Sequence, residues 1–262
     1  MKDHSFAVMA YKDSPYLQAC IDSLKNQTVV SEIYITTSTP SEHIHSIAGK
    51  NGIPVYTTTS GQGIAHDWNF ALQQAKTKLV TLAHQDDIYL SSYTEKCLAA
   101  INKFDDTLIC FTGYHEIVGT EVRKDNTLLR IKEFMLRFFM PFKNNLTSTY
   151  WKWRLLAFGC PISAPTVMYC LDNLGGFQFS RQFTVSIDWE AWSRIALMKG
   201  RFVYVPDALV YHRIHADSET SSAIEASRRL EEDEMMYRKF WQPGIARILT
   251  KLYTGSYKSN QL

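Results

Sequence analysis

The sequence predicts an α/β fold in which a mainly parallel sheet is covered by helices. Short apolar runs, such as residues 6–10 and 78–83, alternate with segments whose apolar residues recur at helical spacing. Hydrophobic residues make up 45% of the 262 residues, which is enough for a substantial core. Alternating strands and helices over this length are typical of one large α/β domain.

The first half of the chain shows this alternation clearly. Residues 6–10 predict a strand, and Ser14-Pro15 supplies an N-cap and a first-turn proline for a helix through Leu24. Residues 33–35 and 53–56 predict short strands. The helical spacing of Ile64, Trp68 and Leu72 predicts a helix before the strand at 78–83. A helix at 93–104 and a strand at 108–111 follow.

The clean alternation stops after this strand, and a basic, aromatic segment begins. Residues 123–154 contain eight Lys and Arg residues against Asp125 and Glu133, a local balance of +6, interleaved with six Phe and Trp residues. A basic amphipathic helix rich in aromatic residues is typical of an interfacial membrane contact. The alternative is a helical insert, at about 123–158, that packs its aromatic side chains on the main domain and solvates its charges.

Strands and helices resume beyond the insert. We expect strands at 165–171, 202–205 and 209–211, a turn at 174–177 and a helix at 188–198. Within residues 224–241, the charged residues at 228, 229 and 231–234 have a spacing that predicts a solvated helix with i,i+4 pairs. We therefore divide the chain into one domain at 1–222 and a helical tail at 223–262.

Composition excludes several classes of protein. A formal charge of +2 does not favour a nucleic-acid partner. The five cysteines include no CxxC pair, which argues against a disulfide framework or zinc site and favours buried, reduced thiols. The N-terminus lacks a basic segment followed by a long apolar one, and no run of about 18 apolar residues occurs, so we expect a cytoplasmic protein.

The segment His84-Gln85-Asp86-Asp87 directly follows the apolar run at 78–83. In an α/β sheet, the carboxyl ends of the strands are where ligands bind. Paired carboxylates suit a hard divalent cation that holds a diphosphate. This segment therefore predicts an enzyme that uses a nucleotide sugar.

Five segments in order resemble the family 2 glycosyltransferases, which are inverting enzymes with the GT-A fold. The segments are the strand, Tyr11 loop and helix ending in Ser23-Leu24-Lys25-Asn26-Gln27-Thr28; Gly63-Ile64 with Asn69; the acidic segment at 84–87; Asp188-Trp189-Glu190; and Tyr211-His212-Arg213-Ile214-His215. The resemblance covers nearly the whole chain. It implies a GT-A fold, with a mixed, mostly parallel sheet flanked by helices, a donor-binding half at about 1–115 and an acceptor-binding half at about 159–222.

The resemblance also implies roles for individual residues. Asp87 would be a ligand of Mn²⁺ or Mg²⁺, with His215 completing the metal shell, and Asp188 would be the base that deprotonates the acceptor hydroxyl. The donor, expected to be a UDP-sugar, would contact Tyr11, Thr37, Asp67, Asn69, His84, Asp86 and Arg213. The acceptor, a glycan or lipid-linked sugar of a bacterial surface polysaccharide, would contact Gly175, Gly176 and Trp189. Taken alone, Asp188 is better explained as a helix N-cap, and His215 as a polar residue on the loop after the last strand.

Three departures from the family pattern affect the donor site. Residues 36–39, Thr-Thr-Ser-Thr, stand where an acidic pair is usual, His84 replaces the first acid of the metal motif, and Trp68 stands where arginine is common. We interpret these as marks of a subgroup with its own donor pocket, and the alternative is a catalytically degenerate nucleotide-sugar-binding protein. A dehydrogenase or nucleotidyltransferase is disfavoured because the first strand-to-helix loop, residues 11–15, contains no glycine for a pyrophosphate.

Overall fold

The computed structural model describes residues 3–61, 63–124, 127–141, 144–214 and 223–258. The first half of the chain alternates strands and helices, and it includes a helix at Glu42–Asn51 and a two-residue strand at Ile88–Tyr89 that were not predicted from the sequence. Its elements are β1 (His4–Ala10), α1 (Leu17–Lys25), β2 (Glu32–Thr37), α2 (Glu42–Asn51), β3 (Val55–Thr57), α3 (Ile64–Gln73), β4 (Leu79–His84), β5 (Ile88–Tyr89), α4 (Tyr93–Ile101) and β6 (Thr107–Val118).

The second half contains short elements followed by long ones. They are β7 (Glu121–Arg123), α5 (Thr127–Phe139), β8 (Asn145–Leu146), α6 (Thr149–Leu155), β9 (Val167–Cys170), α7 (Leu171–Leu174), α8 (Ile187–Ala196), β10 (Arg201–Ile214), α9 (Ala223–Phe240) and α10 (Pro243–Lys258). Two single 3₁₀ turns, Leu156–Phe158 and Ala164–Thr166, lie between α6 and β9. The described residues of the basic segment therefore form two helices and two short strands rather than one helix.

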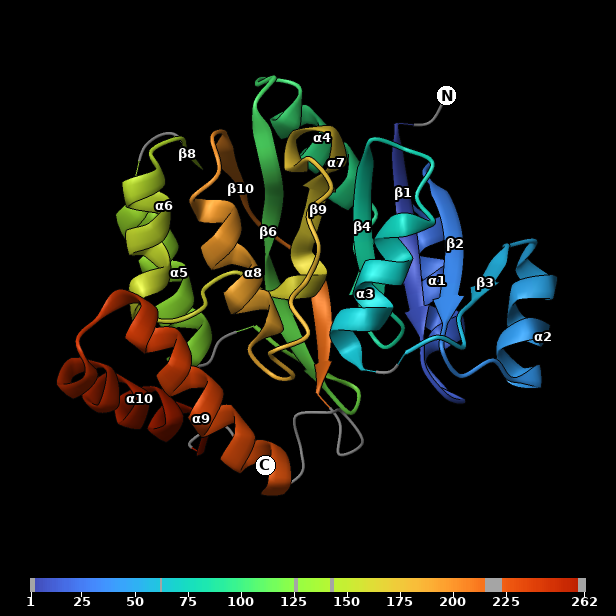
Figure 1. Cartoon of the computed structure of the whole chain (residues 1–262). Helices are drawn as coiled ribbons and strands as arrows, with labels where there is room; N and C mark the ends of the chain where they lie inside the picture. The colour runs from blue at the N-terminus through green and yellow to red at the C-terminus, as the bar shows by residue number, and fades with distance from the viewer. Residues whose placement is uncertain (1–2, 62, 125–126, 142–143, 215–222, 259–262) are drawn as a thin grey trace.

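In the described part of the chain, ten strands form one mixed sheet (Figure 1). The order is β3-β2-β1-β4-β9-β6-β10-β5, with β7 on β6 and β8 on β10. The longest pairings, β1 with β2, β1 with β4 and β6 with β10, are parallel, whereas β9 runs antiparallel to both of its neighbours. The parallel register brings the carboxyl ends of β1, β2 and β4 to one edge of the sheet.

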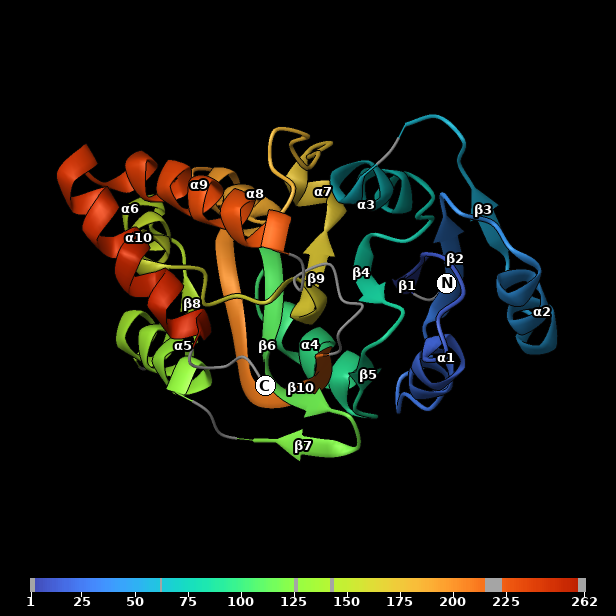
Figure 2. The same cartoon turned by 90° about the horizontal axis from the view of Figure 1, so that it is seen from below.

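Helices cover both faces of the sheet, as Figure 2 shows for α3 and α8 on one side and α1 and α4 on the other. Side-chain alternation along β1 supplies both layers, because Phe6 and Val8 pack with α1 while Ala7 packs with α3. The buried residues of α1, Leu17, Cys20, Ile21 and Leu24, recur at the spacing of one helix face. All five cysteines are buried and reduced, as predicted.

Three sequence predictions need correction. Helix α1 begins at Leu17 with Tyr16 at its N-cap, so Ser14 and Pro15 precede the helix instead of supplying its N-cap and first-turn proline. The two short strands predicted at 202–205 and 209–211 are parts of the single strand β10, whose register on β6 shifts between Val205 and Val210. This bulge takes up Pro206, which has no N–H to donate to the ladder. In the predicted solvated tail, Glu232 and Asp233 are buried, with exposures of 5% and 1%. Among the described residues, no helix is both long enough and apolar enough to span a bilayer.

Candidate active site

The acidic segment lies at the sheet edge that the sequence predicts. His84 ends β4 beside Met9 of β1, and the backbone N–H of Asp87 donates to the carbonyl of His84, at 3.2 Å. This turn places Asp86 and Asp87 just beyond the carboxyl ends of β1 and β4. The edge is where α/β sheets bind ligands, because here the loops diverge and leave backbone and side-chain polar groups accessible.

Asp87 is completely buried, and the end of β10 holds it in place. Its Oδ1 accepts hydrogen bonds from Nδ1 of His212 and the backbone N–H of Arg213, both at 2.9 Å. Burial opposes ionisation, but the charge and hydrogen bond of His212 outweigh it and hold the pKa of Asp87 below its ordinary value. Burial alone would lower the pKa of His212, yet the Asp87 carboxylate raises it to about 9. The pair is therefore ionic at neutral pH.

A divalent cation fits the side chains of His84, Asp86 and Asp87. One potential ligand atom from each lies within 4.8 Å of the others. Nε2 of His84 and Oδ2 of Asp87 are buried and have no hydrogen-bond partner, which is costly unless another group binds there. Burial lowers the pKa of His84, which keeps its imidazole neutral and able to donate a lone pair. The donor set of two carboxylates and one imidazole suits Mn²⁺ or Mg²⁺.

Arg213 and Gln85 order the loops around this cluster. The guanidinium of Arg213 donates from Nε to the carbonyl of Asp86, at 3.0 Å, and lies 4.3 Å from the ring centroid of Tyr16. The side-chain amide of Gln85 accepts from the backbone N–H of Tyr11, at 3.1 Å, and donates to its carbonyl, at 2.9 Å. Gln85 thereby joins the loop after β4 to the loop after β1, a role that the sequence analysis missed.

Thr37 and Asp67 lie on the neighbouring loops. Thr37 is 3% exposed, and its hydroxyl accepts from the backbone N–H of Thr39, at 3.0 Å. Ser38 Oγ donates to Oδ2 of Asp67, at 2.9 Å, which connects the end of β2 to the first turn of α3. These contacts extend the polar edge from β4 towards β2, on the side where the Tyr11 loop also lies.

Asp188 occupies the first turn of α8 and is half-buried. Its Oδ1 accepts from the backbone N–H of Trp189, at 2.7 Å, and the thiol of Cys160 lies 3.7 Å from Oδ2. Burial raises the pKa of Asp188, while these contacts and the charge of Lys132 moderate the rise. The Asp188 carboxylate in turn affects the pKa of His84, so the candidate base and the acidic cluster share one electrostatic environment.

Lys132 is a second residue that the sequence analysis missed. It projects from α5, in the basic segment, and donates to the hydroxyl of Tyr114, at 3.0 Å. Its charge lowers the pKa values of Asp188 and His212. The basic segment therefore contributes a cation to the candidate site as well as surface charge.

Helix α9 holds the segment that leads into α8. The Glu232 carboxylate accepts from the backbone N–H groups of Thr184, Val185 and Ser186 and from the Thr184 hydroxyl, at 2.7–2.9 Å. Asp233 accepts from the Ser186 hydroxyl, at 3.0 Å. The sequence pattern of α9 does not predict this role. Burial of Glu232 and Asp233 depends on how α9 packs against a segment that is distant in the sequence.

Four of the predicted site residues lie away from the acidic cluster or are engaged with other parts of the chain. Asn69 uses both amide atoms on the backbone of Phe179, at 2.7 and 2.9 Å, and so links α3 to the second half of the chain instead of facing a donor. Trp189 is 1% exposed and donates to the carbonyl of Leu156 within the core. Gly175 and Gly176 follow the antiparallel strand β9, which leads the chain to the opposite edge of the sheet. His215 lies outside the described residues.

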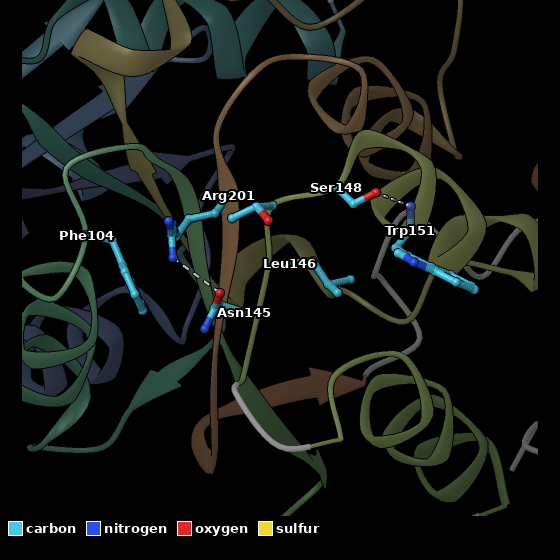
Figure 3. Close-up of a pocket in the computed structure, with 7 residues that line it drawn as sticks. Phe104, Asn145, Leu146, Ser148, Trp151 and Arg201 are labelled. Atoms are coloured by element: carbon cyan, nitrogen blue, oxygen red, sulfur yellow. Dashed lines mark hydrogen bonds between the residues drawn. The ribbon is translucent and has the colours of Figure 1, made fainter.

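Figure 3 shows a pocket of about 570 Å³ that is separate from this site. It is lined by Phe104, Asn145, Leu146, Thr147, Ser148, Trp151 and Arg201. Arg201 begins β10, whereas His212, which binds Asp87, lies near the end of that strand. The pocket therefore lies at the amino end of β10, away from the acidic cluster.

Comparisons with known proteins agree with the fold. The structure of residues 1–349 of TarS from S. aureus, in complex with UDP-GlcNAc, has 17% sequence identity and a TM-score of 0.64, covering 95% of this chain and 70% of that one. A mannosyltransferase from Pyrobaculum calidifontis, in complex with GDP-Man and Mn²⁺, has 15% identity and a TM-score of 0.63, covering 96% and 69%. Against a longer TarS structure, this chain spans 41% of that chain's length.

A third similar structure is glucosyl-3-phosphoglycerate synthase from Mycobacterium tuberculosis, in complex with Mn²⁺, UDP and phosphoglyceric acid, at 13% identity and a TM-score of 0.60, covering 92% and 80%. No curated protein matches the chain by sequence. The model of the family described as glycosyl transferase family 2 matches residues 5–160, more than half of the chain. The chain therefore belongs to glycosyl transferase family 2 and has the GT-A fold.

Proposed function

We propose that this enzyme transfers a sugar from a nucleoside diphosphate donor, expected to be a UDP-sugar, to an acceptor hydroxyl with inversion at the anomeric carbon. The observation that supports this most directly is the cluster of His84, Asp86 and Asp87, with two buried atoms that have no hydrogen-bond partner. The solved structures with similar folds bind UDP-GlcNAc, UDP or GDP-Man, which supports a nucleotide-sugar donor.

We assign the diphosphate to the edge of the sheet beside this cluster. His84, Asp86 and Asp87 would hold Mn²⁺ or Mg²⁺, which when bound neutralises charge on the leaving diphosphate. Tyr11, Thr37 and Asp67 would line the nucleoside side, on the loops that Gln85 and Ser38 connect. We retain the proposal that the His84 motif and the threonines at 36–37 mark a subgroup with its own donor pocket.

Asp188 is the proposed base. An acceptor hydroxyl is a weak nucleophile at neutral pH, and a carboxylate that takes its proton during attack lowers the barrier. Half-burial of Asp188 raises its pKa and makes the carboxylate a stronger base, while Lys132 limits that rise. Its Oδ1 is oriented by the N–H of Trp189, which leaves Oδ2 as the atom to receive the proton, with the Cys160 thiol 3.7 Å away.

The acceptor would be a glycan or a lipid-linked sugar of a bacterial surface polysaccharide. The exposed aromatic residues of the 123–154 segment, which include Phe134, Phe138 and Trp151, support a peripheral contact with a membrane that holds such an acceptor. Lys132 belongs to the same segment and interacts electrostatically with Asp188. The same segment would therefore contact the membrane through its aromatic side chains and influence the proposed base, Asp188, through Lys132.

The function is tested by incubating the protein with UDP-, GDP- and dTDP-sugars and Mn²⁺ and measuring release of the nucleoside diphosphate. We expect release from one class of donor, dependent on Mn²⁺. Asp188→Asn should reduce turnover by at least about 100-fold while donor binding, measured by calorimetry, stays close to that of wild type. Binding of a nucleotide sugar by wild type without any turnover would favour the degenerate, non-catalytic relative instead.

A further inference from the structure

Exposed apolar side chains are concentrated on three helices, α5, α6 and α10. Eight large apolar residues on these helices are between 46% and 68% exposed: Ile131, Phe134, Phe138, Tyr150, Trp151, Ile245, Ile248 and Leu252. Single exposed apolar residues are normal on a protein surface, but a contiguous set on neighbouring helices marks a surface for interaction. We call these eight residues the three-helix face.

Helix α5 has two apolar sides. Leu128 and Leu136 are buried against the core, with exposures of 9% and 4%. Ile131, Phe134 and Phe138, spaced three and four residues apart, form a second stripe that faces solvent. A helix that only covers a core needs one apolar stripe, so packing within the described structure leaves the second stripe unexplained.

Helix α10 repeats this arrangement. Ala246 and Thr250 are buried, with exposures of 0% and 2%, on the side that packs against the domain. Ile245, Ile248 and Leu252 form an exposed stripe with the same three- and four-residue spacing as in α5. The sequence predicts only a helical tail for this region, and the second stripe emerges from the structure.

Ring contacts join α5 to α6. The ring centroids of Phe134 and Phe138 are 6.2 Å apart, those of Phe138 and Phe139 5.1 Å, and those of Phe139 and Trp151 6.3 Å, while Trp151 also contacts Tyr150. Helix α10 contacts α5, and the two lie side by side in both views (Figures 1 and 2). The exposed apolar residues thus lie on helices that contact one another.

The three helices are also strongly basic. Their sequences contain eight Lys and Arg residues and one acidic residue, Glu133, a formal charge of +7, whereas the whole chain has +2. The rest of the chain is therefore net negative. Arg130, Arg137, Arg247 and Lys251 are exposed beside the apolar stripes, and Arg137 also pairs with Glu133, at 2.6 Å. Lys152 is buried and does not contribute to this surface.

We propose that the three-helix face docks on an anionic membrane surface, with its aromatic and aliphatic side chains in the headgroup region and its Arg and Lys side chains on lipid phosphates. The positive charge of the three helices is complementary to an anionic lipid surface, and this favours a membrane as the partner. A symmetric dimer through the same face would bring the two basic surfaces together, which is unfavourable. The proposal rests on the membrane contact proposed above for the 123–154 segment and extends it to α10, and it does not depend on which donor or acceptor the enzyme uses.

The test is co-sedimentation of the full chain with vesicles of phosphatidylcholine, with and without phosphatidylglycerol. We expect binding to the anionic vesicles, weakened by high salt. Phe134→Ser with Phe138→Ser, and separately Ile248→Ser with Leu252→Ser, should each weaken binding by at least about tenfold, because each removes one exposed stripe. Arg247→Gln with Lys251→Gln should reduce the preference for anionic over neutral vesicles.

The matched control is Val29→Ser with Val30→Ser, which removes two exposed apolar residues, 37% and 64% exposed, from the loop between α1 and β2. This control should bind vesicles like wild type. All variants change exposed side chains, and circular dichroism would verify their folding. The proposal is overturned if wild type ignores anionic vesicles or if the stripe variants bind them as well as the control. If wild type does not bind vesicles but forms a dimer, and the stripe variants are monomers while the control remains a dimer, the three-helix face is instead an interface between two copies of the chain.

Discussion

The substitution Glu232→Gln tests how much the hydrogen bonds from α9 to residues 184–186, which precede α8, stabilise the fold. Each oxygen of the Glu232 carboxylate accepts two hydrogen bonds from Thr184, Val185 and Ser186. Glutamine keeps the shape but turns one acceptor into an NH₂ group, so one pair of donors loses its partner. A buried donor without an acceptor costs about 1–3 kcal/mol, and loss of the charge weakens the remaining bonds. We expect the free energy of unfolding to fall by about 2–4 kcal/mol.

The pH dependence of this effect has a definite sign. Burial opposes ionisation of Glu232, but the three backbone N–H groups outweigh it and lower its pKa. A lowered folded-state pKa stabilises the protein above the unfolded-state pKa of about 4.3, and the stabilisation is lost as pH falls through the folded-state value. The difference between wild type and Glu232→Gln should therefore be complete at pH 7 and shrink below about pH 4.

The assay is urea unfolding at pH 7 and below pH 4, followed by tryptophan fluorescence. Glu231→Gln is the matched control, because Glu231 is an exposed neighbour on the same helix and its substitution should change stability by less than about 0.5 kcal/mol. If Glu232→Gln unfolds at the same urea concentration as this control at pH 7, the carboxylate does not anchor the segment and the argument is wrong.

Three further predictions concern the other carboxylates. Burial raises the pKa of Asp233 to about 7, so its ionisation destabilises the fold increasingly from about pH 4 upward; Asp233→Asn should be more stable than wild type at pH 8 and nearly equal to it at pH 4, as measured by urea unfolding. Asp87→Asn should weaken Mn²⁺-dependent UDP binding by at least about tenfold in calorimetry, and unchanged binding would exclude Asp87 as a ligand. Because burial raises the pKa of Asp188, turnover should decline on acidification at a pH above the ordinary carboxyl pKa of 3.8, and a flat profile down to that pH would argue against this base.

Features that depend on local order were predictable from the sequence. An apolar strand followed by His84, Asp86 and Asp87 specifies a polar edge, because parallel neighbours bring their carboxyl ends together. Leu17, Cys20 and Leu24 recur at the spacing of one helix face, and these residues are buried in α1. In both cases the relevant pattern lies within about ten residues of chain.

Features that depend on strand direction or tertiary burial were not predictable. The direction of the four-residue strand β9 is not encoded in its apolar run, so the position of Gly175 and Gly176 at the opposite edge could not be foreseen. Glu232 resembles a surface residue in sequence, and only the fold brings it to Thr184. His212 lies within a recognised segment, but its bond to Asp87 depends on how β10 pairs with β5.

The most direct test of the central proposal, a metal-dependent diphosphate site at His84, Asp86 and Asp87, is a thermal-shift series. The protein would be heated with UDP, GDP, dTDP or CDP, each with and without Mn²⁺. At 100 times its Kd, a ligand that binds only the folded state adds about 2.7 kcal/mol of stability, which corresponds to a rise in Tm of several degrees. We predict such a rise for one nucleotide, expected to be UDP, only when Mn²⁺ is present. An unchanged Tm with every nucleotide and metal would contradict the proposed site.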